Sequence, residues 1–218
     1  MATAVPETEE AAAVATVADL LESLGGIPAE RVLLRPAPGT ATEADWERLP
    51  GELQKSCELV DGTLVRKPMG VPESILAAAL IRILGVFVTP SRLAIIMGSA
   101  GPIRFLPGQL RMPDVSLFLR ARLPEGKAPT KQVTDLAPDL AVEVLSPSNT
   151  RKEIEKKLEL YHSTGVQLVW IVDPKKRTVR VHRLDEPFVL LNVGDELAGE
   201  PVLPGFRLPL EDLFRELE

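Results

Sequence analysis

Glu143 is the residue whose place in the sequence most strongly suggests chemistry. It lies in DLAVEVL, residues 139–145, where alternation puts apolar side chains on both faces of an extended segment. Such a strand is expected to be buried on both sides, and an unpaired carboxylate there would be strongly destabilising. Glu143 is therefore expected to contact a cation, a metal ion or a solvated cleft.

A lysine follows on the apolar side of a predicted helix. Thr150 and Glu153 have the spacing of a capping box, which predicts that the helix begins at Thr150. By helical periodicity, Lys157 falls on the apolar stripe that includes Tyr161, whereas Lys156 does not. The strand acid and the inward lysine are thus two parts of one predicted site.

Asp114 adds a second acid, at the start of the strand predicted in RMPDVSLFL. An aspartate and a glutamate on neighbouring strands, with a lysine nearby, can hold Mg²⁺ or Mn²⁺ through hard oxygen ligands, and a substrate phosphate completes the coordination. In such a site Lys157 would orient or deprotonate the attacking water, or stabilise charge on the phosphorus transition state.

Each of these residues also has a purely structural interpretation. Asp114 could be a strand-start acid that satisfies backbone amides. Glu143 and Lys157 could form a buried ion pair without a catalytic role.

The elements that must position these residues form a mixed α/β sheet. Residues 139–145 and 166–174 are predicted strands on either side of the helix, which gives one parallel crossover among antiparallel strands. Asp61-Gly62, between two apolar runs, predicts a two-residue hairpin turn. Further strands are predicted at residues 31–36, 93–99, 101–107, 112–120 and 177–184, helices at 42–49 and 73–88, and a strand or two with a short helix within 187–218.

The chain is predicted to hold one domain with an N-terminal appendage. Residues 1–40 form this extension, with a predicted helix that ends at two glycines and with disorder expected for residues 1–10. Residues 41–218 form the domain. This length suffices for one substantial core.

Composition narrows the function classes. The apolar content of 45% and charged content of 26% are those of a soluble globular protein. One cysteine excludes an internal disulfide, and with two histidines it leaves no structural zinc spacing, so a reducing, cytoplasmic setting is expected. The N-terminus does not read as a secretory signal, and the length of residues 73–88, together with Arg82, favours a buried core helix without membrane association.

The net charge of −6 disfavours a large nonspecific nucleic-acid surface but permits a local basic groove. A charge run such as Lys175, Lys176 and Arg177 is more often a solvated turn. The candidate groove residues are Arg104, Arg111, Arg120, Arg122, Lys175, Lys176 and Arg177.

Two segments carry a resemblance to a known family. PDVSLF and PDLAVEVLSPSNTRKEIEKKLELYHSTGVQLVWIVDP resemble the Uma-type restriction endonuclease family of the PD-(D/E)XK nuclease superfamily, over residues 56–183. The resemblance implies a restriction-endonuclease-like fold, a mixed β-sheet core flanked by helices. It also implies a Mg²⁺- or Mn²⁺-dependent endonuclease that hydrolyses DNA as a homodimer.

The resemblance also assigns residues. Asp114 corresponds to the motif aspartate, Glu143 to the motif acid, and Lys157 to the lysine that this branch carries on the helix, because Leu145 stands where other nucleases have it. Glu58 matches an acid that the family usually keeps, which implies a metal-ligating or positioning role. Its structural alternative is an exposed hairpin acid paired with Lys67 or Arg66. A second departure lies at the main helix, where Glu73 or Ser74 stands in place of the histidine of many relatives.

Two other functions compete with the nuclease. One is a catalytically inactive nucleic-acid-binding or assembly module of the same fold. The other is glycoside hydrolysis by Asp114 and Glu143, which explains neither the inward lysine nor the low aromatic content of 4%.

Overall fold

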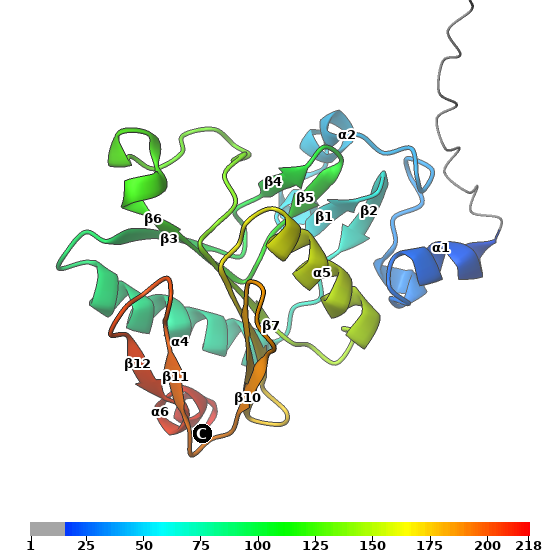
Figure 1. Cartoon of the computed structure of the whole chain (residues 1–218). Helices are drawn as coiled ribbons and strands as arrows, with labels where there is room; N and C mark the ends of the chain where they lie inside the picture. The colour runs from blue at the N-terminus through cyan, green and yellow to red at the C-terminus, as the bar shows by residue number, and fades with distance from the viewer. Residues whose placement is uncertain (1–15) are drawn as a thin grey trace, which may run out of the picture.

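The computed structural model describes residues 16–218 and is shown in Figure 1. The disorder expected for residues 1–10 lies outside this part of the chain. Of the predicted N-terminal helix, the described part contains α1, Val17–Ser23.

The main sheet has six strands in the order β10-β9-β8-β7-β6-β3. β7 and β8 are parallel and every other neighbouring pair is antiparallel, so the predicted mixed sheet with a parallel crossover is confirmed. The strands are β3 Ala94–Gly98, β6 Val115–Leu119, β7 Leu140–Val144, β8 Leu168–Asp173, β9 Thr178–Arg183 and β10 Val189–Leu191.

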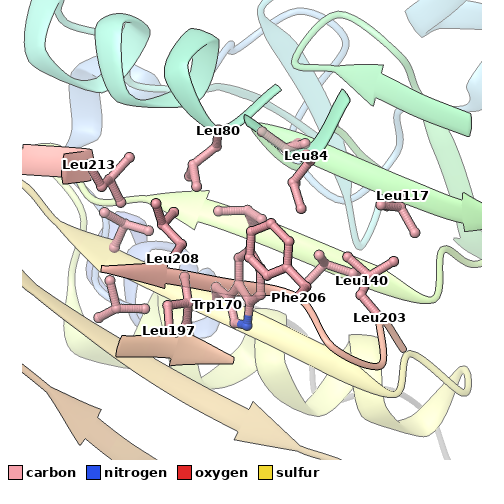
Figure 2. Close-up of a cluster of buried hydrophobic side chains, with 14 of the residues drawn as sticks. Leu80, Leu84, Leu117, Leu140, Trp170, Leu197, Leu203, Phe206, Leu208 and Leu213 are labelled. Carbon is pink, nitrogen blue, oxygen red and sulfur yellow. The ribbon is translucent and has the colours of Figure 1, made fainter. Parts of the chain in front are cut away.

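One face of this sheet packs on the long helix α4, Val71–Val88, and on C-terminal elements. Figure 2 shows Leu80 and Leu84 of α4 near Leu140 of β7 and Trp170 of β8. The C-terminal elements are the hairpin β11 Glu196–Ala198 and β12 Arg207–Pro209 and the helix α6 Leu210–Phe214.

In the described part of the chain, α4 has the length and apolar composition of a membrane span. Its leucines Leu76, Leu80 and Leu84 pack in the core of the domain, whereas Val71 and Val86 are exposed.

The opposite face is covered by α5, Arg151–Ser163, which connects β7 to β8 (Figure 1). The alternation predicted for β7 is confirmed: Leu140 packs on the α4 side and Ala141 on the α5 side. All five residues of β7 are buried, as expected for a strand covered on both faces.

A second, antiparallel sheet lies beside α5 in the order β2-β1-β5-β4. The hairpin turn predicted at Asp61-Gly62 is confirmed, and both residues have the positive φ that such a two-residue turn requires. β5 is not among the predicted strands. The strands are β1 Cys57–Val60, β2 Thr63–Arg66, β4 Ile103–Leu106 and β5 Gln109–Arg111, and the short helices α2 Glu43–Glu47 and α3 Gly51–Gln54 precede them.

The strand predicted at residues 31–36 is wrong, because only Val32 pairs, through a single bridge to Val65. The N-terminal segment, residues 16–40, instead contains α1, a 3-10 helix at Ala29–Arg31 and irregular chain. Its Leu24 and Ile27 are buried in a small cluster with Val60 and Val65. The division of the chain at residue 40 stays a prediction.

Candidate active site

Asp114 lies immediately before β6 and is held by several contacts. Its backbone NH donates to the carbonyl of Val142 at 2.9 Å, and its Oδ2 accepts from the NH of Val144 at 2.7 Å. Its Oδ1 lies 2.7 Å from the ammonium of Lys67. Asp114 thus has the backbone-amide contact of the structural interpretation and a buried cation as well.

Glu143 projects from β7 toward α5. Its Oε2 accepts from Lys157 at 2.9 Å, and its Oε1 accepts from the hydroxyl of Tyr161 at 2.5 Å. Both donors come from α5, one turn apart, so the predicted pairing of the strand acid with the inward lysine is confirmed. Lys157 is 3% exposed, whereas Lys156 is exposed.

The register of the main sheet brings the two acids together. β6 and β7 pair Val115 with Val142, and Asp114, one residue earlier, contacts the backbone of Val142 through its NH and the backbone NH of Val144 through its carboxylate. These two contacts flank Glu143, so Asp114 and Glu143 lie beside each other.

Glu58 lies on β1, between β2 and β5, and is 1% exposed. Its Oε1 accepts from the NH of Met112 at 3.0 Å and from Lys157 at 3.4 Å, and its Oε2 lies 3.5 Å from Arg111. The alternative of an exposed hairpin acid paired with Lys67 or Arg66 is wrong, because β1 is an inner strand and Lys67 contacts Asp114 instead.

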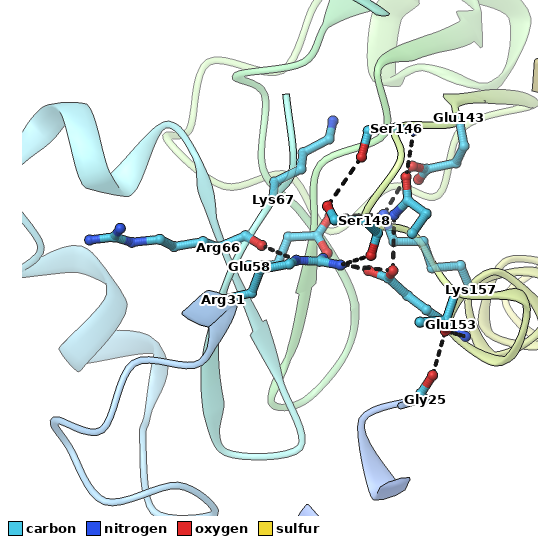
Figure 3. Close-up of polar contacts among 12 residues, drawn as sticks. Gly25, Arg31, Glu58, Arg66, Lys67, Glu143, Ser146, Ser148, Glu153 and Lys157 are labelled. Atoms are coloured by element: carbon cyan, nitrogen blue, oxygen red, sulfur yellow. Dashed lines mark hydrogen bonds and ion pairs between the residues drawn. The ribbon is translucent and has the colours of Figure 1, made fainter. Parts of the chain in front are cut away.

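The site is a balanced cluster of buried charges. The three carboxylates of Asp114, Glu143 and Glu58 face the three cations Lys67, Lys157 and Arg111, and each of the six is less than one-tenth exposed. Buried charges persist when they are paired and hydrogen-bonded in this way. Figure 3 shows Lys157 on α5 between Glu58 and Glu143.

Neighbouring charges shift the pKa values of Glu58 and Lys157 toward the charged forms of these side chains. Burial alone would raise the pKa of Glu58, but Lys157, Arg111 and Lys67 lower it to about 2. Burial also opposes the charge on Lys157, yet Glu143, Glu58 and Glu153 raise its pKa above the ordinary value. Lys157 is therefore a cation at neutral pH, which fits charge stabilisation or water orientation better than proton abstraction.

The pKa of Glu143 is raised above its ordinary value. Burial raises its pKa, Lys157 and Lys67 oppose this, and the nearby Asp114 and Glu58 raise it further. A divalent cation between Asp114 and Glu143 would relieve this repulsion, and their oxygens are the ligands that Mg²⁺ and Mn²⁺ prefer.

Two carboxylates would hold such an ion only together with substrate oxygens and water, and each of their four oxygens already has a partner in this structure. Among residues 16–218, no group of three or more His, Cys, Asp or Glu side chains is arranged to hold a metal ion.

A pocket of about 300 Å³ opens beside this cluster. Glu58, Arg111 and Lys157 line it together with Leu24 and Ile27 of the N-terminal segment. Solvent can thus approach the cluster from the side of Glu58 and Lys157.

Of the candidate groove residues, Arg111 belongs to the cluster. Most of the others contact acidic side chains or backbone carbonyls outside it. Arg120 donates to the carbonyl of Gly126 at 2.6 Å. The other pairs are Arg104 with Glu43 and Asp135, Arg122 with Asp139, Lys176 with Asp173, and Arg177 with Glu218.

Sequence reasoning missed the roles of Lys67 and Tyr161 as partners of the two motif acids. The inward position of Tyr161 on the helix was a usable signal, because its hydroxyl needs a partner when buried. Lys67 follows a hairpin and precedes a proline, and no local pattern marks it as buried.

The capping box predicted at the start of α5 is only half formed. Thr150 accepts from the NH of Glu153 at 3.0 Å, but the carboxylate of Glu153 turns to Arg31 and Asn149. A guanidinium binds a carboxylate more strongly than a single backbone NH does.

A mixed sheet flanked by helices, with α5 between its two parallel strands, is the fold of the restriction-endonuclease-like class of nucleases. The family model described as "Uma2: Putative restriction endonuclease" matches residues 44–211, and the chain belongs to this family. The resemblance found in the sequence is thereby confirmed, and family and fold together support a nuclease that acts on nucleic acid.

Among solved structures, the chain is similar to a protein from Anabaena variabilis, described as a putative nuclease belonging to DUF820. The TM-score is 0.71 at 24% identity, over 81% of this chain and 99% of that one. The likeness shows a shared fold. No curated protein matches the chain significantly.

Proposed function

We propose that this protein is a divalent-metal-dependent endonuclease that hydrolyses DNA phosphodiester bonds. The observation that carries the proposal is the apposition of Asp114 and Glu143, each already paired with a buried lysine. Family membership and the nuclease fold support the reaction class.

Asp114 and Glu143 would hold Mg²⁺ or Mn²⁺. When bound, such an ion polarises the phosphoryl oxygen and lowers the pKa of a coordinated water. Lys157, a cation at neutral pH, would stabilise the charge that develops on the phosphate.

Glu58 would keep Lys157 in place, since it contacts the lysine from the side opposite Glu143. Tyr161 would fix the orientation of the Glu143 carboxylate through its hydrogen bond.

Lys67 shares the carboxylate of Asp114 with any metal that binds there. An ammonium ion and a divalent cation compete for the same oxygens, so we expect Lys67→Met to bind Mn²⁺ more tightly than the wild type in calorimetry. A weaker affinity would mean that Lys67 supports the metal site instead.

The direct test is cleavage of plasmid DNA with Mg²⁺ or Mn²⁺ added to metal-stripped protein. We expect Asp114→Asn, Glu143→Gln and Lys157→Met to lose cleavage while circular dichroism shows a folded protein. Lys156→Met is the matched control, because Lys156 adjoins Lys157 on α5 but is exposed. Unchanged cleavage by Asp114→Asn would sink the assignment.

A catalytically inactive nucleic-acid-binding or assembly module remains the second candidate. It is favoured by the lysines that already neutralise Asp114 and Glu143 without a metal. This candidate predicts no Mg²⁺ or Mn²⁺ binding that depends on both acids, which calorimetry on the Asp114→Asn and Glu143→Gln variants decides.

We further propose that DNA rather than RNA is the substrate and that two copies act together, since a twofold dimer can cut both strands. Parallel assays on double-stranded DNA, single-stranded DNA and RNA test the first point. Light scattering on the purified protein tests the second, and a monomer that cuts both strands would contradict it.

A further inference from the structure

Arg31 is a buried arginine that lies outside the residues matched by the family model. It is 6% exposed and forms a two-point contact with Glu153, with Nη2 at 2.6 Å from Oε1 and Nη1 at 2.9 Å from Oε2. Its Nε donates to the carbonyl of Arg66 at 2.8 Å. Figure 3 shows this side chain between the end of β2 and the start of α5.

The two backbones that Arg31 joins are those that carry the site lysines. Arg66 immediately precedes Lys67, whose ammonium contacts Asp114. Glu153 lies one helical turn before Lys157, whose ammonium contacts Glu143. One guanidinium thus ties together the chain segments on which both lysines stand.

The surrounding contacts are close enough to fix this geometry. The carbonyl of Gly25 accepts from the hydroxyl of Thr150, the N-cap residue of α5, at 2.5 Å. A Cβ on Gly25 would lie 2.7 Å from the backbone nitrogen of Glu153. The N-terminal segment therefore rests directly on the first turn of α5.

We propose that Arg31 is a positioning residue for the reaction at this site. It acts through the carbonyl of Arg66 and the carboxylate of Glu153. Through them it holds Lys67 in contact with Asp114 and Lys157 in contact with Glu143. The expected effect of Arg31 on cleavage rests on the proposed nuclease function, whereas its expected effect on the positions of Lys67 and Lys157 does not.

The alternative is that Arg31 merely anchors the N-terminal segment. A matched control exists, because Lys152 pairs with Glu22 and also joins this segment to the first turn of α5. That pair is exposed, with 61% of each side chain accessible. Lys152→Met therefore removes an anchor without touching Arg66 or Glu153.

Two variants test Arg31 itself. Arg31→Lys keeps a cation near Glu153 but loses the fork and the contact with Arg66. Arg31→Met/Glu153→Met replaces both charged side chains of the buried pair with apolar ones, so neither charge is left unpaired. It therefore serves as the test if Arg31→Lys is unstable.

Two measurements apply to each variant. Nitrogen-15 NMR of lysine ammonium groups, assigned with Lys67→Met and Lys157→Met, reports whether the two lysines remain in their buried pairs without metal. Steady-state cleavage of DNA with Mg²⁺ gives kcat and KM separately.

We expect both Arg31 variants to shift or broaden the Lys67 and Lys157 ammonium signals and to lower kcat about tenfold or more at similar KM, because small misplacements of catalytic groups are costly. Lys152→Met should leave the signals and kcat as in the wild type. Wild-type signals and kcat in both Arg31 variants, or equal changes in Lys152→Met, would overturn the proposal. Absence of cleavage by the wild type would refute the nuclease function, while the ammonium signals would still decide what Arg31 holds.

Discussion

At the scale of single residues, the burial of Glu143 predicts that its carboxylate has a cation or a hydrogen-bond donor as partner. The apolar strand around it requires that its charge be compensated, and the compensation consists of Lys157 and the hydroxyl of Tyr161. Removing one partner of such a pair leaves the other as an uncompensated buried charge.

We therefore expect Lys157→Met to lower the free energy of unfolding by about 3 kcal/mol, because Glu143 and Glu58 both lose their shared cation. The double variant Lys157→Met/Glu143→Gln should lose less than the sum of the two single variants. Urea denaturation of the four proteins at neutral pH measures the coupling. Additive losses would mean that the two side chains do not interact as the distances indicate.

His182 is expected to make stability depend on pH. Burial, with smaller contributions from Arg180 and His162, lowers its pKa from 6.5 to about 4. The unfolded chain then binds a proton more readily than the folded one, so stability is fully present above pH 6.5 and declines toward pH 4.

Because the ring is only partly buried, we expect this decline to contribute about 1–2 kcal/mol. His182→Gln should flatten the dependence between these pH values when unfolding is measured in urea. The pH dependence of unfolding of His162→Gln is measured in the same way for comparison. The expectation fails if His182→Gln and the wild type lose stability in parallel.

At the scale of elements, the two ends of α5 differ in how closely they are packed. Its first turn meets the N-terminal segment at Gly25, and its end is followed by Gly165. Both glycines have positive φ, +92° and +89°, but a Cβ on Gly165 would meet nothing within 4 Å.

This difference provides a matched pair of substitutions. Gly165→Ala should cost about 1–2 kcal/mol, the strain of an L-residue in the left-handed region. Gly25→Ala adds a clash with the backbone of Glu153, so it should cost more and should increase hydrogen exchange in the first turn of α5. Thermal unfolding and hydrogen-exchange measurements compare the two variants. Equal effects would mean that Gly25 of the N-terminal segment is not in close contact with α5.

At the scale of the whole molecule, two sheets and one helix meet at the charged cluster. The main sheet supplies Asp114 and Glu143, the smaller sheet supplies Glu58 and Arg111, and α5 supplies Lys157. A ligand that binds across this junction should stabilise the fold as a unit.

Mg²⁺ or Mn²⁺ is therefore expected to raise the Tm in a concentration-dependent way. Binding only to the folded state contributes about 2.7 kcal/mol when the free ion reaches about 100 times its Kd. Differential scanning calorimetry of the wild type and Asp114→Asn measures this, and the variant should respond far less. An equal rise in both proteins would locate the ion elsewhere.

Much of the site could be predicted because its signals are local. The alternation of β7, the helical periodicity of α5 and the cap at Thr150 depend on neighbouring residues alone. They indicated that Glu143 and Lys157 face a common interior and that Asp114 begins a neighbouring strand of a mixed sheet. The family pattern then assigned a role to each of the three and implied the restriction-endonuclease-like fold.

The rest depended on long-range pairing. The sequence alone determined the strand-helix-strand unit and the inward direction of its acid and lysine, because side-chain direction follows from local periodicity. Tertiary structure decided that Asp114 lies beside Glu143, that Glu58 is buried on an inner strand, that Lys67 joins the cluster, and that Arg31 pairs with Glu153. These outcomes follow from sheet register and from the packing of two sheets against one helix, which no short segment encodes.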